Sequence, residues 1–236
     1  MEDSQNRRRE MFLRAKNFGT DHDGDFAANS LGKQLFTELN DIVAQLETHA
    51  ADEASGRGTA REGTSTRGAA REALRDDLEA ISRTARAIAE DTPGINDKFR
   101  LPRGNNDQIL LSAARAFATD AAPFSAQFIN YGLPADFLAD LNSDIVNFEA
   151  AVSHQSSGVS DSIAAGAAIE ETIDAGMVIV RKLDAVVRNQ YSNNPSVLAQ
   201  WTSASHTERG PRRSSESPPS PQPPGSTPSP TPLPSA

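Results

Sequence analysis

The chain contains no cysteine, which excludes disulfide bonds, thiolate metal ligands and a cysteine nucleophile. Aromatic residues make up only 6% of the 236 residues, and Trp201 is the single tryptophan. Runs of β-branched residues, which favour strands, are scarce, whereas the strong helix formers alanine, leucine, arginine and glutamate are abundant. This composition predicts an all-α protein.

Positive charge and long apolar runs are also in short supply. The 23 lysines and arginines are outnumbered by 32 aspartates and glutamates, so the net charge is −9, which favours solubility and opposes binding to nucleic acid. No window approaches the roughly 18 apolar residues of a membrane span. The arginines near the N-terminus are not followed by the apolar core of a secretory signal. We therefore expect a cytoplasmic protein without membrane association.

Proline is concentrated at the C-terminal end, where ten of the fifteen prolines lie between Pro211 and Pro234 among serines and threonines. Such a segment buries too little apolar surface to offset its ordering entropy, so residues 207–236 are predicted to be a disordered tail. Residues 1–24 are expected to be a flexible or partly docked segment. The helical bundle domain should span residues 25–206, which is enough chain for one domain.

Apolar residues recur at steps of three and four along five stretches, which predicts an antiparallel bundle of about five main helices. The first helix should begin near Asp25, and Pro123 should kink or break the third because proline has no amide hydrogen. A short helix over residues 196–206 should dock through Trp201. The five stripes are Leu31, Leu35, Leu39, Ile42 and Leu46; Leu74, Leu78, Ile81, Ala85 and Ile88; Leu110, Ala114, Phe117, Ala121, Phe124 and Phe128; Leu138, Leu141, Ile145, Phe148 and Val152; and Ile163, Ile169, Ile173, Met177, Val180, Leu183 and Val187.

Residues 47–73 carry no large apolar side chain and admit two interpretations. One is a continuous helix whose small residues allow close approach of a neighbour. The other is a helical hairpin that turns at residues 55–58. Glycine costs roughly 1 kcal/mol in a helix interior and commonly follows a helix end, so Gly56, Gly58 and Gly63 favour the hairpin. With a second turn at residues 156–158, helices of about 30 residues would give a bundle about 45 Å long.

Residues 31–93 and 133–195 resemble each other at a constant offset of 102. Leu39 and Gly56, for example, correspond to Leu141 and Gly158. A repeat of this kind would mean that two duplicated helical hairpins build the bundle. The identities are few, so a chance alignment of two amphipathic regions is the alternative.

Residues that catalysis or metal binding requires do not form a recognisable motif. The four histidines are too far apart for an HxxxH or HExxH pair. Residues 20–25 are acidic but lack the glycine and glutamate positions of an EF-hand, and the glycines at 58 and 63 lack the lysine of a phosphate-binding loop. We therefore expect no catalytic residue, no metal ligand and no cofactor, and we favour a non-enzymatic role.

Two basic stretches are the candidate partner-binding residues. Arg67, Arg71 and Arg75 share one helical face, although nearby acids favour a salt-bridged surface over a phosphate-binding ridge. The segment from residue 97 to 103 alternates basic and large apolar residues, which suits either packing across the end of the bundle or contact with a partner. Its candidate residues are Lys98, Phe99, Arg100 and Arg103.

Three strings resemble an uncharacterised bacterial family of helical proteins. They begin at Arg83 (Arg-Thr-Ala-Arg-Ala-Ile-Ala, followed by Asp-Thr-Pro-Gly), Lys98 (Lys-Phe-Arg-Leu-Pro-Arg) and Leu183 (Leu-Asp-Ala-Val-Val-Arg-Asn). The resemblance spans most of residues 30–206. It implies an all-helical bacterial protein and carries no catalytic residues.

Three functional hypotheses follow. The first is a non-enzymatic interaction or structural protein that binds a protein partner or a second copy of itself. The second is a nucleic-acid-associated or regulatory protein that uses the arginine-rich face. The third is a bundle that binds a ligand in a cavity.

Overall fold

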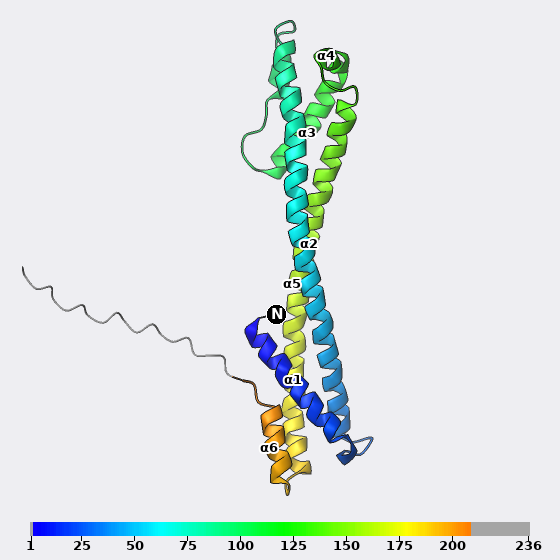
Figure 1. Cartoon of the computed structure of the whole chain (residues 1–236), viewed down its shortest axis with the longest axis vertical. Coiled ribbons are helices and arrows are strands. Elements are labelled where there is room, and N and C mark those ends of the chain that lie inside the picture. The colour runs from blue at the N-terminus through cyan, green and yellow to red at the C-terminus, as the bar shows by residue number, and fades with distance from the viewer. Residues whose placement is uncertain (1, 209–236) are drawn as a thin grey trace, which may run out of the picture.

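Two long antiparallel helices run along the molecule in the computed structural model, which describes residues 2–208 (Figure 1). Helix α2 spans Leu31–Ile88 and helix α5 spans Phe137–Gln190. Their 58 and 54 residues correspond to lengths of about 87 and 81 Å at about 1.5 Å per residue. All regular elements in the described range are helical, which confirms the all-α prediction. Nearly all of the predicted tail, residues 207–236, lies outside that range.

The favoured hairpin turns at residues 55–58 and 156–158 were wrong, because α2 and α5 pass through them without interruption. The glycines lie where the two helices cross in close contact. A Cβ at Gly56 would lie 2.7 Å from the amide nitrogen of Ser162, and one at Gly158 would lie 2.5 Å from that of Ala60. Close helix packing therefore offsets the intrinsic cost of glycine in a helix. Because each pair of expected helices is one continuous helix, the molecule is about twice the expected length of about 45 Å.

Helix α2 also begins later than expected, at Leu31 rather than near Asp25. The side chain of Ser30 caps it by accepting a hydrogen bond from the amide of Lys33 at 3.3 Å. Asp25 instead ends a short 3-10 helix, η1 (Asp23–Asp25).

One end of the molecule, the lower lobe, combines the start of α2 and the end of α5 with α1 (Asp3–Asp21) and α6 (Pro195–Ala204). Trp201 is fully buried at its centre, as the sequence predicted, and its indole Nε1 donates a hydrogen bond to Asp184 at 2.9 Å. The core of this lobe includes Met11, Phe12, Phe18, Phe36, Leu39, Leu46, Ile173 and Leu183.

The other end, the upper lobe, combines the end of α2 and the start of α5 with η2 (Ile95–Phe99), α3 (Asp107–Ala121), η3 (Ala122–Phe124) and α4 (Ser125–Asn130). Pro123 lies in η3, so the predicted break at this proline is confirmed. The core of this lobe includes Leu74, Leu78, Ile81, Phe99, Phe117, Phe128, Leu141 and Phe148.

The two cores are separate, and α2 and α5 alone connect them within the described chain (Figure 1). We call residues 47–73 of α2 and 149–168 of α5 the waist. Small residues dominate it, and Gly56, Gly63 and Gly158 are buried in the crossing. At the glycine crossing, in the middle of the waist, the protein is therefore a two-helix rod rather than a multi-helix bundle.

Candidate functional site

The arginine face is a salt-bridged surface that joins neighbouring helices. Arg67 and Arg71 both form ion pairs with Asp107 in the first turn of α3, the second with an Nη1–Oδ1 distance of 2.6 Å. Arg67 Nη1 also donates a hydrogen bond to Gln155 Oε1 of α5 at 2.8 Å. Arg75 is half-buried one turn further along α2. These contacts join α2, α3 and α5 and partly neutralise the face.

The second predicted stretch is divided between the core and the surface. Phe99 is only 1% exposed, and its ring lies edge-on to Phe117 and Phe128 at centroid distances of 5.2 and 5.4 Å. Lys98 reaches Asp120 of α3, with 3.3 Å between nitrogen and oxygen. Arg100 Nη2 donates to Asp97 Oδ1 at 2.6 Å, and both side chains are exposed.

Arg100 and Arg103 line one cavity together with Arg86 of α2, a residue that the sequence did not group with them. The cavity has a volume of about 490 Å³ and lies between α2 and residues 96–103. Its remaining lining residues are Ser82, Asn96, Phe99 and Leu101.

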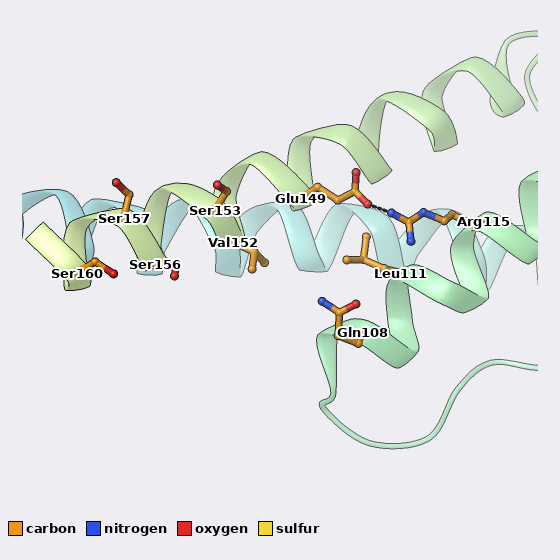
Figure 2. Close-up of a pocket in the computed structure, with 9 residues that line it drawn as sticks. All are labelled: Gln108, Leu111, Arg115, Glu149, Val152, Ser153, Ser156, Ser157 and Ser160. Atoms are coloured by element: carbon orange, nitrogen blue, oxygen red, sulfur yellow. Dashed lines mark hydrogen bonds and ion pairs between the residues drawn. The ribbon is translucent and has the colours of Figure 1, made fainter.

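A larger groove of about 630 Å³ lies between the start of α3 and the waist of α5 (Figure 2). Arg115 of α3 and Glu149 of α5 form an ion pair across one end of it. Figure 2 shows four serines on α5 further along, with Ser156 and Ser160 on the side toward α3. No histidine or unpaired carboxylate lines this groove, so none of its lining groups is placed to activate a serine hydroxyl as a nucleophile.

A histidine, an aspartate and a tyrosine meet at the tip of the lower lobe. His22 Nδ1 lies 3.1 Å from Asp25 Oδ2, which also accepts a hydrogen bond from the Tyr191 hydroxyl at 2.7 Å. The hydrogen bonds from Tyr191 and His22 lower the pKa of Asp25. Burial, and then the hydrogen bond to Asp25, raise the pKa of Tyr191. His22 Nε2 faces Gln200 Oε1 at 3.4 Å. Both ring nitrogens therefore have protein partners, and the cluster holds η1 against α5 and α6.

An acidic cluster lies between α2 and α5 in the upper lobe. Burial, with the negative charges of Asp144, Asp140 and Asp76, raises the pKa of Asp77 to about 6. Among residues 2–208, no group of three or more metal-ligating side chains has a geometry that would hold an ion. The cluster is therefore a site of electrostatic repulsion between two helices.

The waist carries an exposed apolar surface on α5. The side chains of Val159 and Ile163 are one turn apart and 44% and 68% exposed. Ile163 was expected in the core stripe of the last long helix, and that expectation was wrong. The signal was in its spacing, because Ile163 lies six positions before Ile169, out of step with the threes and fours that follow.

This apolar surface lies in a gap between α1 and α3, the two helices that pack against α5 on either side of it. Helix α3 begins near Gln155, because Arg67 bonds both to Asp107 in the first turn of α3 and to Gln155 of α5. The first turn of α1 lies over Glu170, which accepts a hydrogen bond from Gln5 at 2.6 Å. Glu170 follows Gln155 by fifteen positions in α5, a distance of about 22 Å along the helix. We call Val159, Ile163 and the adjoining surface of α5 between Gln155 and Glu170 the waist face.

Comparison with protein-family models, with curated proteins and with solved structures found no match. In the described part of the chain, no helix combines the length and the apolar character that crossing a bilayer requires.

Proposed function

We propose that this chain is a non-enzymatic interaction protein whose two lobes are held apart by the waist and which self-associates through the waist face. The observation that carries the proposal is the 22 Å gap, about fifteen residues of α5, in which Val159 and Ile163 face solvent while a third helix covers α5 on either side. Adjacent exposed apolar side chains can serve as an interaction surface, because a partner that covers them removes apolar area from water.

A second copy of the chain is the occupant that we propose. In a twofold-symmetric contact the same patch is used on both copies, so Val159 and Ile163 of one chain would pack against those of the other. About half of each side chain's transfer free energy is still available, roughly 1 kcal/mol per residue. The contact is therefore expected to be weak and dependent on concentration.

Analytical ultracentrifugation of the full chain over a wide concentration range tests this proposal. The wild type should show a reversible monomer–dimer equilibrium, and the double variant Val159→Ser/Ile163→Ser should shift it toward monomer. Val146→Ser is the matched control, because Val146 is 62% exposed on the same helix but lies in the upper lobe, outside the waist face. A wild type that stays monomeric throughout, or a control that loses association equally, would refute the proposal.

The contacts of the arginine face favour this function over nucleic-acid binding. Arg67 and Arg71 are both paired with Asp107, so a phosphate backbone would have to displace an existing ion pair at each. The net charge of −9 opposes such binding further.

We also propose that the molecule arose by duplication of one helical unit. Helices α2 and α5 end 102 residues apart, at Ile88 and Gln190. Gly56 and Gly158, separated by the same number, contact each other at the crossing. These correspondences support the duplication over a chance alignment. A bacterial origin and a cytoplasmic location stay predictions from the sequence.

A further inference from the structure

The cavity lined by Arg86, Arg100 and Arg103 has the composition of a site for an anion. Three arginines line it, and none of its lining residues is acidic. Its volume of about 490 Å³ falls within the range of small-molecule sites, about 300–1,000 Å³. This cluster stands out in a chain whose net charge is −9.

The positive charge around this cavity is only partly neutralised. Asp97 pairs with Arg100, on the exposed side of the segment. Arg86 Nη2 donates to the neutral hydroxyl of Ser82 at 3.3 Å, which is long for a bond to a charged donor. No carboxylate of residues 2–208 forms an ion pair with Arg86 or Arg103. Two guanidinium charges therefore remain available to a ligand.

The backbone that carries these arginines is firmly held even though the side chains are exposed. Phe99 and Leu101 pack into the upper core on either side of Arg100. Gly94 and Gly104 bound the segment with φ angles of +91° and +90°, a conformation that favours glycine. Arg86 projects from α2, whose adjacent residues Ser82 and Ala85 are buried. The three arginine side chains thus extend from fixed backbone positions.

The planar fork of a guanidinium group matches two oxygens of a phosphate, which is why arginine predominates at such sites. Two available arginines balance the charge of one phosphate monoester dianion. Asn96 and Ser82 add neutral donors, while Phe99 and Leu101 provide an apolar wall. We propose that this cavity binds the phosphate group of a small phosphorylated molecule, a role that does not depend on self-association at the waist.

Isothermal titration of the full chain, with inorganic phosphate and glycerol phosphate as probes, tests the proposal. Sodium chloride at matched ionic strength separates specific binding from screening. Wild-type protein should show saturable binding of at least one probe. Tighter binding of glycerol phosphate would identify an organic monoester as the ligand, and equal binding would identify the free anion. Both results support a phosphate site.

The variant Arg86→Gln/Arg103→Gln should weaken binding by at least about tenfold, the loss expected when one charge-assisted hydrogen bond is removed. Arg83→Gln is the matched control, because Arg83 is an exposed arginine of α2 that does not line the cavity. Arg103→Lys keeps the charge but removes the fork, so it should bind with intermediate affinity. Absence of saturable binding to the wild type, or equal weakening by Arg83→Gln, would overturn the proposal.

Discussion

Replacing Asp77 with asparagine should stabilise the protein at neutral pH. Asp77 lies on α2 and faces Asp140 and Asp144 of α5, with Asp76 beside it on its own helix. Apolar residues at the start of α5 and just before it line the pocket beside Asp77, namely Leu133, Pro134 and Phe137. Asp77 Oδ2 is buried and accepts no hydrogen bond from the described residues. An amide of nearly the same shape would remove the charge without creating a cavity.

The size of this effect follows from the pKa. The pKa of Asp77 is raised from 3.8 to about 6 because burial, and then the neighbouring carboxylates, disfavour the charged form. A shift of this size corresponds to about 3 kcal/mol at about 1.4 kcal/mol per unit. Asp77 is only partly buried, so solvent screening should reduce the gain to about 1–2 kcal/mol at pH 7.5.

The sign of the pH dependence is fixed by the direction of the shift. Because the folded protein binds this proton more tightly than the unfolded chain, the contribution of Asp77 is fully present below about pH 3.8 and is lost as pH rises through about 6. The advantage of Asp77→Asn should therefore shrink between pH 7.5 and pH 4.5.

Urea denaturation followed by circular dichroism at several pH values measures both quantities. Asp76→Asn is the control, because Asp76 is exposed and its replacement should change the free energy of unfolding by about 0.5 kcal/mol or less. A loss of stability in Asp77→Asn at pH 7.5, or a gain that is the same at pH 4.5, would refute the reasoning.

Two further predictions concern packing, and both are measured as free energies of unfolding. Gly158→Ala should destabilise by about 1–3 kcal/mol, because the new methyl group would lie 2.5 Å from the backbone of Ala60. Gly68→Ala, in the same waist but with open space around it, should instead stabilise by up to about 1 kcal/mol, and equal effects at the two sites would contradict the close crossing. Trp201→Ala should destabilise by about 3–5 kcal/mol by emptying the centre of the lower core, and a change below about 1 kcal/mol would show that α6 is not an anchor.

The sequence predicted the elements whose signals are local. Most of the apolar stripes, the break at Pro123 and the docking of Trp201 depend on residues a few positions apart, and these were confirmed. Leu31 and Ile163 are exceptions, because both are exposed. The continuous helix over residues 47–73 was the less favoured of two interpretations, because the glycines of the waist are explained by a contact between Gly56 and Gly158, which lie on different helices. Local propensity favoured a turn, and tertiary packing overrode it.

The candidate sites were harder to predict for the same reason. Arg67 and Arg71 were expected on a salt-bridged surface, but their partner Asp107 was not identified because it lies 40 and 36 residues away in the chain. Arg86 meets Arg100 and Arg103 only after residues 89–99 fold back against α2. The waist face becomes visible only when the ends of α1 and α3 are placed, since sequence spacing alone does not show where a covering helix stops.

The separation of the two cores has a consequence for the order of folding. The upper core draws on one uninterrupted stretch, Leu74–Phe148, whereas the lower core needs residues near both ends of the described chain, from Met11 to Ala204. One lobe is thus nested inside the other along the chain. A ribosome releases every part of the inner lobe while the outer one still lacks its closing helices, and domains generally fold as they emerge. The upper lobe can therefore fold first and bring together the two chain segments, one on each side of it in the sequence, that form the lower lobe.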